Sequence, residues 1–374
     1  MPMKRVRALF VLFAFVVAAV GCGGARQRRG RSDPPAPAAA PAAASPVSRI
    51  ATLKEGGGRL DWFEDKIAFD MRSARDVFEV YVMKPDGTGV TCLTCDHPDL
   101  PNGHKGQPAW HPSGRYLVFQ AEKGEHRDVR FSRVVTPGAG VLNDLWVLDT
   151  ETNRATRIRE VKDDAGEGTL HAHFSRDGRL LSWSEMVESG GLKKGKQLGY
   201  WQLMIADFRV ADRQPSLASV RSFTPGGPGF YENHGFSPDG SRLIFTSNFE
   251  AKGRVEADIY VMEIETQKLT RMTNEGWNEH AHYSPDGRLI VWMSNLGLRS
   301  GGAEYWIMNS DGSNKRRLTY FNEKGHPQYR GPNTMVADFS WRPDGKAFGA
   351  YTGGKVITAS EGERIVLVEL QLDE

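Results

Sequence analysis

Five short stretches of the chain repeat one pattern of residues: an aromatic residue, a polar residue, in most copies a proline, and then Asp-Gly or Ser-Gly. They fall at 109–114, 173–178, 235–240, 282–287 and 340–345. A short run of apolar, β-forming residues follows each copy, at 116–119, 180–183, 243–246, 289–292 and 347–351. Because proline fixes φ and glycine allows a positive φ, each copy predicts a tight turn between two strands.

Two more strands are predicted in each repeat. Apolar stretches recur at 81–83, 145–148, 202–205, 259–262 and 305–308. Turn residues such as Pro85-Asp86-Gly87 come next, and then a fourth run whose clearest endings are Leu-Thr or Met-Thr, at 93–94, 272–273 and 318–319. Four short strands joined by turns form one blade of a β-propeller.

The number of repeats gives the number of blades. Residues 60–69 lack Pro-Asp-Gly but keep the aromatic residue and the second strand, which makes six units. The turn glycines of successive units are 64, 62, 47 and 58 residues apart. These steps exceed the roughly 40–45 residues of typical repeats, so most blades carry insertions. We therefore predict an all-β fold, a six-bladed β-propeller of four-stranded antiparallel blades.

The repeat also resembles a known family. The order aromatic-Ser-Pro-Asp-Gly, Leu-x-Phe, Asp-Ile-Tyr-Val-Met (Asp258–Met262) and Leu-Thr is similar to the WD40-like repeat of the TolB propeller. The resemblance covers about residues 60–374 and implies the propeller fold. The chain departs from TolB in leaving no space for its separate N-terminal α/β domain. The resemblance therefore implies the propeller and does not extend to a role in a Tol–Pal system.

Closure of the ring can be predicted from the two ends of the repeat region. The last unit has strands near 337–341, 347–351 and 364–370 and lacks a fourth. Residues 49–53, before the first unit, have strand character and no unit of their own. We expect this segment to supply the missing strand and so remove an open edge. In the alternative, residues 356–358 form the third strand and 365–370 the fourth.

The first residues predict export and a lipid anchor. Three basic residues (Lys4, Arg5 and Arg7) precede an apolar run at 8–20, and Gly21-Cys22 ends it. A basic start, a short apolar core and small residues before a cysteine are typical of a bacterial lipoprotein signal, resembling the lipobox whose cysteine is acylated. An ordinary signal peptide with an incidental cysteine is the alternative. We expect a signal peptide at 1–21, a disordered Arg/Ala/Pro-rich tether at 22–47 and the propeller at 48–374.

The expected location follows from this signal. We expect the protein on the periplasmic side of the cell envelope, held to the membrane by lipid on Cys22. The residue after the cysteine is Gly23 rather than an aspartate that retains lipoproteins in the inner membrane, which favours the outer membrane.

Charge narrows the class of partner. The net charge of the whole chain is +2. The signal contributes three positive charges and the tether a net three more. The residues from Arg49 onward therefore have a net charge of −4. A mildly acidic domain gives no electrostatic case for nucleic-acid binding.

The other two cysteines lie close together in the sequence, as Cys92-Leu93-Thr94-Cys95. In an oxidising periplasm this pair suits a disulfide, or remains as two unreactive thiols. A zinc site using His97 and His104 is less favoured, because no second Cys-x-x-Cys exists.

Histidines and carboxylates gather on the predicted innermost strands, at the mouth of the central channel. Five of the ten histidines lie in three of these strands. The candidate site residues are His171, His173, Glu232, His234, Glu279, His280, His282 and Asp338. Alternation along a strand puts His171 with His173, and His280 with His282, on one side, where these four could bind a divalent metal. Oligogalacturonide lyases are similar propellers with a histidine-bound metal, although their full ligand set is not evident here. The favoured alternative is a hydrogen-bonded polar plug without metal.

Signals of catalysis are few, so an enzyme is the less favoured hypothesis. The sequence has no Gly-x-Ser-x-Gly, phosphate-binding loop, dinucleotide fingerprint or His-Glu-x-x-His, and we assign no catalytic residue. Long predicted loops at 95–106, 122–141, 187–199, 248–257, 295–303 and 321–335 emerge on one face. We therefore predict a monomeric, non-enzymatic binding or scaffold lipoprotein whose partner is a protein or a glycan. The alternative is a metal-dependent polysaccharide lyase or hydrolase that uses the channel histidines.

Overall fold

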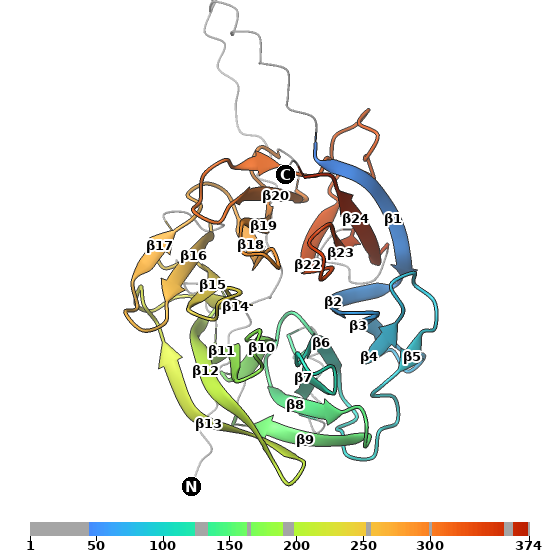
Figure 1. The fold of residues 1–374 in the computed structure, drawn as a ribbon, viewed down its shortest axis with the longest axis vertical. Helices are drawn as coiled ribbons and strands as arrows, with labels where there is room; N and C mark the ends of the chain where they lie inside the picture. The colour runs from blue at the N-terminus through green and yellow to red at the C-terminus, as the bar shows by residue number, and fades with distance from the viewer. Residues whose placement is uncertain are drawn as a thin grey trace, which may run out of the picture.

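The computed structural model describes residues 45–123, 134–162, 166–189, 198–251, 256–298, 301–354 and 362–372. Its strands form six antiparallel four-stranded sheets arranged as blades around a central channel (Figure 1). The predicted six-bladed β-propeller is confirmed. The signal peptide, Cys22 and nearly all of the predicted tether lie outside the described residues.

The first three blades follow one another along the chain, each beginning at the channel and ending at the rim. Blade one consists of β2 (Gly57–Phe63), β3 (Lys66–Arg72), β4 (Phe78–Met83) and β5 (Thr91–Cys92). Blade two consists of β6 (Lys105–Trp110), β7 (Tyr116–Glu122), β8 (Asn143–Asp149) and β9 (Arg154–Arg159). Blade three consists of β10 (Gly168–Phe174), β11 (Leu180–Glu188), β12 (Tyr200–Ala211) and β13 (Gln214–Phe223).

The remaining blades complete the ring. Blade four consists of β14 (Tyr231–Phe236), β15 (Arg242–Ser247), β16 (Asp258–Glu263) and β17 (Leu269–Arg271). Blade five consists of β18 (Asn278–Tyr283), β19 (Leu289–Ser294), β20 (Glu304–Asn309) and β21 (Arg316–Arg317). Blade six consists of β22 (Met335–Trp341), β23 (Ala347–Gly353), β24 (Arg364–Leu370) and, at its rim, β1 (Val47–Glu55). In the part of the chain that the structure describes, no helix is long and apolar enough to cross a membrane.

The repeated turn motif joins the first two strands of a blade through its own side chains. In blade five, the Ser284 hydroxyl donates to Oδ1 of Asp286 at 2.6 Å, and the same oxygen accepts the backbone N–H of Arg288 at 3.0 Å. Gly287 has a φ of 75° and donates its N–H to the carbonyl of Ser284. The serine, aspartate and glycine of the motif therefore close the turn, as the sequence predicts.

The ring is closed by the strand that precedes the first blade. β1 pairs antiparallel with β24, from Val47 opposite Leu370 to Glu55 opposite Arg364. The first strand of the chain thus occupies the rim of the last blade, and the predicted closure is confirmed. Figure 1 shows β1 at the rim of the last blade, beside β24, with the chain continuing into β2 of blade one.

A second contact joins these two blades beside the channel. The Ser340 hydroxyl of blade six donates to Oδ1 of Asp61 in blade one at 2.8 Å. The same hydroxyl accepts the N–H of Trp62 at 2.9 Å, and Oδ2 of Asp61 accepts the N–H of Trp110 in blade two at 2.7 Å. Asp61 therefore connects three blades through one carboxylate.

The core consists of apolar side chains packed within and between blades. Between blades five and six, the ring of Tyr305 lies 5.4 Å from those of both Phe339 and Phe348. Both phenylalanines are almost fully buried, and Trp341 packs against Phe348 at 5.5 Å. The aromatic residue of the turn motif thus belongs to the core, which explains why each repeat contains one.

The Leu-Thr endings of the repeats have a structural role on the outer strands. In three blades the threonine hydroxyl donates to a carboxylate at the start of the third strand and accepts a backbone N–H from that strand. The carboxylate–threonine distances are 2.6 Å for Glu79–Thr94, 2.8 Å for Asp258–Thr273 and 2.7 Å for Glu304–Thr319. In blades four and five an arginine two residues before the threonine also binds the carboxylate. We call this unit the carboxylate–threonine brace.

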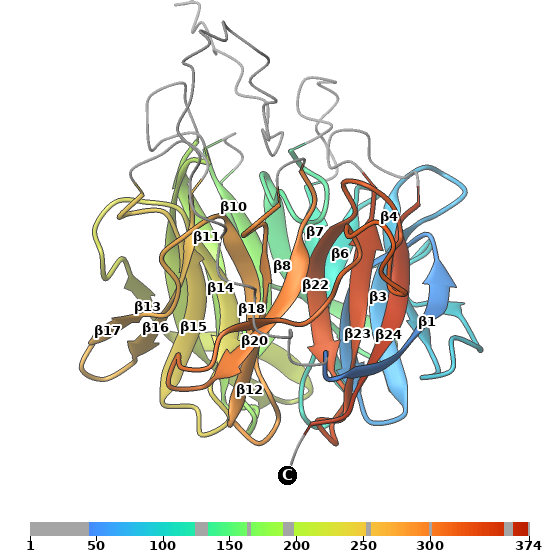
Figure 2. The same cartoon turned by 90° about the horizontal axis from the view of Figure 1, so that it is seen from above.

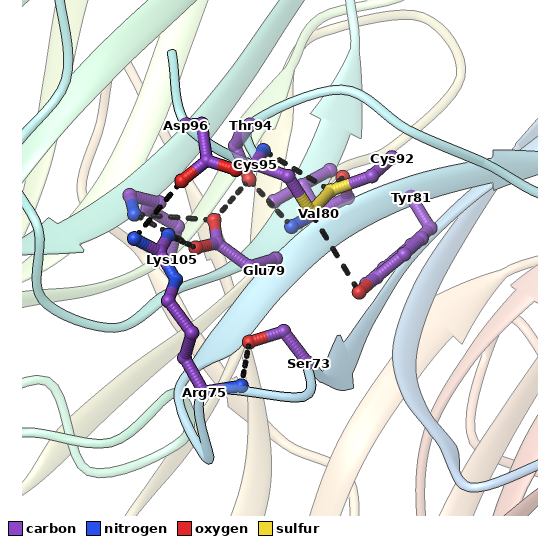
Figure 3. Close-up of a disulfide and its surroundings, with 10 residues drawn as sticks. All are labelled: Ser73, Arg75, Glu79, Val80, Tyr81, Cys92, Thr94, Cys95, Asp96 and Lys105. Atoms are coloured by element: carbon purple, nitrogen blue, oxygen red, sulfur yellow. Dashed lines mark hydrogen bonds and ion pairs between the residues drawn. A yellow bond between two sulfur atoms is a disulfide. The ribbon is translucent and has the colours of Figure 1, made fainter.

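Blade one has Cys92 where blades four and five have that arginine. The structure joins Cys92 to Cys95 in a disulfide, with the two Cα atoms 5.7 Å apart (Figure 3). The positive charge for Glu79 comes instead from Arg75 and Lys105, each with a nitrogen 3.1 Å from its carboxylate. The disulfide therefore replaces the arginine of the brace at this position.

Candidate metal and ligand site in the central channel

A β-bulge interrupts every innermost strand at the channel. The regular pairing with the second strand is lost between Gly57 and Leu60, and at the equivalent place in the other five blades. At Gln107, His171 and His280 the bulge residue has a φ of 49°, 48° and 52°. Such a conformation is costly for a residue other than glycine and is found mainly where a bulge re-aims a functional side chain.

Each bulge contributes one polar side chain to a common level of the channel, one from each blade in turn. We call this set the channel ring: Arg59, Gln107, His171, His234, His280 and Asp338. Apart from Arg59, its members contact one another. Gln107 Nε2 lies 2.8 Å from His171 Nε2, and Oδ1 of Asp338 lies 3.4 Å from His171 Nδ1 and 3.8 Å from His280 Nδ1.

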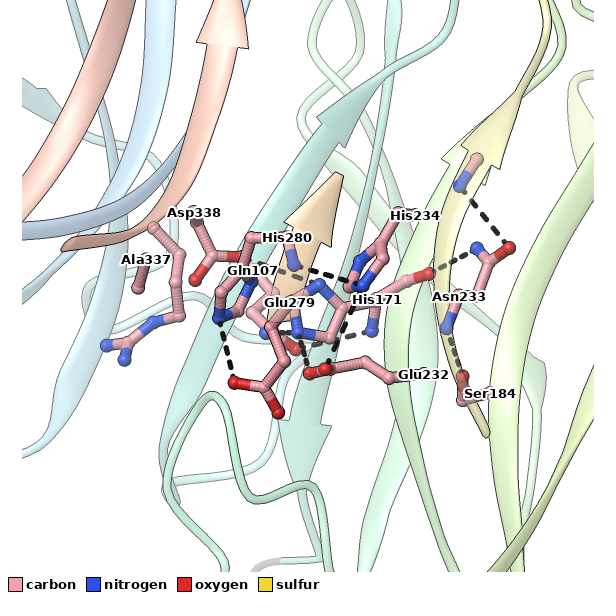
Figure 4. A network of polar contacts seen from close by, with 12 residues as sticks. Gln107, His171, Ser184, Glu232, Asn233, His234, Glu279, His280, Ala337 and Asp338 are labelled. Carbon is pink, nitrogen blue, oxygen red and sulfur yellow. Dashed lines mark hydrogen bonds and ion pairs between the residues drawn. The ribbon is translucent and has the colours of Figure 1, made fainter. Parts of the chain in front are cut away.

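Three histidines of the ring form a compact group (Figure 4). One nitrogen each from His171, His234 and His280 lies within 4.8 Å of the other two. The exposed fractions of the three residues are 4%, 1% and 7%. Three imidazole nitrogens that converge in this way are the usual start of a transition-metal site.

Carboxylates surround this triad. Oε1 of Glu232 lies 2.9 Å from His171 Nε2, and Oε2 of Glu279 lies 3.8 Å from His280 Nε2. Both glutamates are buried, and Glu279 precedes the His280 bulge on β18. With Asp338, three carboxylates therefore lie beside the histidine triad. The nearby cation Arg59 is already paired with Asp70 at 2.7 Å, so it does not balance them.

Several buried polar atoms of the site have no hydrogen-bond partner. They are His234 Nδ1, His280 Nδ1 and the Oε2 atoms of Glu232 and Glu279. A buried polar atom without a partner costs about 1–3 kcal/mol. Such atoms are therefore rare in folded proteins, and a group of them at one place indicates a site that ordered water, an ion or another ligand fills.

The environment shifts the pKa values of these groups in the directions expected for a crowded, buried site. Burial, with the charges of His280 and His171, holds the pKa of His234 well below its ordinary value. Burial and the neighbouring Glu232 raise the pKa of Glu279 well above the usual range. Although burial opposes it, the charges of Glu232 and Asp338 raise the pKa of His171. A neutral imidazole such as His234 is the form that binds a metal.

These observations test whether the residues fit a divalent metal. Three convergent imidazole nitrogens, adjacent carboxylate oxygens and unpartnered buried atoms are what such an ion requires. Some of these groups also pair with one another, as a polar plug without metal requires: Gln107 Nε2 lies 2.8 Å from His171 Nε2, and His234 Nε2 lies 2.8 Å from the Thr246 hydroxyl. The donor set therefore fits a divalent transition metal held by His171, His234 and His280, with Glu232, Glu279 and Asp338 as the available carboxylates.

A cavity of about 200 Å³ lies next to the channel ring. It is bounded by the later residues of the innermost strands, among them His173, His282 and Trp341. These residues follow the bulges and precede the hairpin turns, so the cavity extends from the ring toward the hairpin-turn end of the channel. Figure 2 shows the strands of the blades running between the two ends of the channel. The long loops predicted from the sequence emerge at the opposite end of the channel.

The predicted site residues do come together in the channel, but in a different grouping. The sequence pairs His171 with His173 and His280 with His282 as metal ligands. In the structure His234 joins His171 and His280, whereas the rings of His173 and His282 lie 5.2 Å apart at the level of the cavity. His171 and His173 do lie on one side of their strand, with stacked rings whose centroids are 6.4 Å apart, but His173 lies further along the channel than the triad.

Two residues of the channel ring are absent from the predicted site: Arg59 and Gln107. A signal for them does exist in the repeats. Arg59, Gln107, His171, His280 and Asp338 each lie three residues before the aromatic residue of their blade. In blade four the residue at this position is Asn233. The bulge of this blade lies one residue further along, at Gly235, so His234 contributes to the channel ring instead.

Comparisons with known proteins agree with the fold. Residues 216–352 match the TolB β-propeller domain. An uncharacterised protein of Agrobacterium fabrum is 33% identical over 277 residues, which span 72% of this chain and 74% of that protein. The chain belongs to the TolB-like β-propeller family.

Solved structures extend this comparison of the TolB-like propeller. A structure assigned to TolB from Agrobacterium tumefaciens superposes with a TM-score of 0.50 at 20% identity, covering 75% of this chain and 80% of that one. A structure of an oligogalacturonate lyase in complex with manganese superposes with a TM-score of 0.49 at 13% identity, covering 88% and 94%. At these identities the similarity concerns the fold alone.

Proposed function

We propose that this TolB-like propeller is an envelope-anchored binding protein that holds a divalent metal ion in its central channel. The observation that supports the metal is the histidine triad, with one nitrogen each of His171, His234 and His280 within 4.8 Å of the other two. The metal would neutralise the adjacent carboxylates and satisfy the unpartnered atoms. When bound, it would supply a fixed positive charge to a ligand that reaches the channel.

Elemental analysis of the purified mature protein tests this proposal. We expect about one divalent metal ion per chain, and stabilisation against heat when zinc or manganese is added to protein stripped with a chelator. His280→Ala removes one nitrogen of the triad and should lose the metal. His282→Ala is the matched control, because it removes a half-buried channel histidine outside the triad and should keep the metal. A wild-type protein that neither carries nor is stabilised by metal would refute the proposal.

The propeller would act from the membrane. The signal-like start and Cys22 support a lipid anchor that holds it on the periplasmic side of the outer membrane. The partner of such a protein would be a protein or a glycan of the envelope. Cys22→Ser should release the protein into the soluble fraction, whereas the wild type should partition into detergent. A variant that still partitions into detergent would count against lipidation.

A second function, a metal-dependent polysaccharide lyase or hydrolase, is favoured by one observation. The triad is next to the cavity, and His171 borders both, so a substrate in the cavity would reach the metal. Incubation of the metal-loaded protein with acidic polysaccharides distinguishes the two functions. An increase in ultraviolet absorbance, which reports an unsaturated product, or the release of reducing ends would establish an enzyme, provided that His280→Ala abolishes it. Unchanged polysaccharides would leave the binding function.

A further inference from the structure

The carboxylate–threonine braces of blades four and five hold their threonines by an arginine. In blade four, Arg271 Nε donates to the backbone carbonyl of Thr273 at 2.9 Å. In blade five, Arg317 Nε donates to the backbone carbonyl of Thr319 at 2.8 Å. The same arginine also binds the carboxylate of its brace. One side chain therefore fixes both partners of the brace in these blades.

In blade one a covalent bond closes the equivalent loop. Cys92 occupies the position of the arginine, and its disulfide to Cys95 encloses Thr94 (Figure 3). The Thr94 hydroxyl donates to Oε2 of Glu79 at 2.6 Å and accepts the N–H of Val80 at 2.9 Å. The disulfide thus holds this threonine in place as the arginine does in the other two braces.

The carboxylate of this brace also connects it to the central channel. Lys105 is the first residue of β6, and its Nζ lies 3.1 Å from Oε2 of Glu79. Both residues are almost completely buried, so little water reaches them to replace a lost contact. Two residues further along β6, Gln107 Nε2 lies 2.8 Å from Nε2 of His171 in the channel ring. A change in the brace of blade one is therefore transmitted to the start of a channel-lining strand.

The disulfide lies where a reductant can reach it. Both cysteines are half-buried, at the outer edge of blade one. A dithiol reduces such a bond by attack of one thiolate on a sulfur and closure of its own disulfide, so that two electrons and two protons pass to the cysteines. The resulting thiols have no covalent hold on Thr94. Because a thiol is only a weak hydrogen-bond donor, it does not replace the arginine of the other braces.

We propose that the Cys92–Cys95 disulfide is a redox-sensitive lock on the junction between blades one and two. The oxidised form holds Thr94 on Glu79 and so fixes the start of β6. Reduction by a dithiol loosens both, whereas the arginine braces of blades four and five do not respond. The inference is independent of the proposed metal, since no residue of the histidine triad takes part in the lock.

Amide hydrogen exchange of the purified mature protein, followed by mass spectrometry with and without dithiothreitol, tests the lock. Alkylation of Cys92 and Cys95 shows whether the bond has opened. We expect reduction to make β4, which contains the Val80 amide, exchange about tenfold faster, and β6 several-fold faster. β16 and β20 are internal controls, because their Ile259 and Tyr305 amides bind the threonines of the arginine braces. Their exchange should not change.

Two double variants sharpen the test. Cys92→Arg with Cys95→Ser introduces the arginine of the other braces, and β4 should exchange slowly with or without reductant. Cys92→Ser with Cys95→Ser has neither device, and β4 should exchange rapidly in both conditions. The wild-type measurement needs no substitution, so it decides the matter even where a variant folds poorly.

Three results would overturn the inference: a disulfide that dithiothreitol leaves intact in the folded protein, unchanged exchange of β4 after reduction, or equal acceleration of β4, β16 and β20. Acceleration of β4 without β6 would overturn the connection from the brace to the channel. Metal analysis of the oxidised protein tests the proposed function separately, so the failure of one leaves the other standing.

Discussion

Asp61 provides a direct test of how the ring is closed. Replacing it with alanine removes the acceptor for the Ser340 hydroxyl, at 2.8 Å, and for the N–H of Trp110, at 2.7 Å. A donor left unpaired costs about 1–3 kcal/mol, and the lower half of that range applies because Asp61 is only partly buried. The two donors together predict a loss of about 2–4 kcal/mol in the free energy of unfolding for Asp61→Ala.

Urea unfolding followed by tryptophan fluorescence measures this loss. Asp65→Ala is the matched control, since Asp65 is an exposed residue in the turn that follows the same strand, and it should change stability by less than about 0.5 kcal/mol. A double variant with Ser340→Ala should lose less than the sum of the single losses, because the two residues share a hydrogen bond. A loss as small as that of the control would refute the assigned role of Asp61.

The pH dependence of the same variant gives an independent check. Burial raises the pKa of Asp61 above its ordinary value. A carboxyl with a raised pKa binds its proton more tightly in the folded than in the unfolded protein. The stability that it contributes is therefore greatest below the unfolded pKa of about 3.9 and decreases as the pH rises toward the folded value. The destabilisation by Asp61→Ala should accordingly be larger near about pH 4 than near about pH 7.

Three further substitutions test other parts of the fold. In Gly106→Ala the new Cβ would lie 2.5 Å from Oδ2 of Asp70. We expect calorimetry to show a loss of about 1–3 kcal/mol in the free energy of unfolding, and an unchanged melting temperature would contradict the close packing. Thr319→Val removes the hydroxyl that donates to Glu304 at 2.7 Å and should cost about 1–3 kcal/mol in urea unfolding, so a neutral result would rule out the brace as a stabilising unit. Cys95→Ser opens a disulfide between residues only three apart in sequence and should cost about 2 kcal/mol, with the same loss on reduction of the wild type.

Most of the fold could be predicted from the sequence because its local signals agree with one another. The turn residues of 282–287 form the expected hairpin, and the strand at 49–53 takes the place left open in the last blade. Each of these predictions rests on backbone geometry that a few residues impose. Closure in particular followed from counting strands, which requires no knowledge of side-chain contacts.

The site was less predictable, for a physical reason. Which histidines converge depends on the bulges, and a bulge is not encoded by a distinctive residue: Gln107 and His280 adopt a positive φ without being glycine. Strict alternation therefore places His282 in the predicted metal group and leaves out His234, which lies beside His171 and His280 in the structure. Arg59 was not predicted as a site residue, because a single arginine near the start of a strand does not indicate a site by itself. Its position becomes recognisable only when the six repeats are aligned on their aromatic residues.

The position of β1 has a mechanical consequence. The chain reaches the propeller at Val47, which is paired with Leu370 at the end of the last strand. Any pull transmitted through the preceding residues acts first on the hydrogen bond from the Ser45 hydroxyl to the carbonyl of Leu318, and then on this pairing and on the hydrogen bond from the N–H of Gln371 to the carbonyl of Pro46. If the protein is tethered through its N-terminus, drag on a bound partner would stretch the seam of the ring before it reaches the channel. The joint that carries the tension is thus the one that makes the ring continuous.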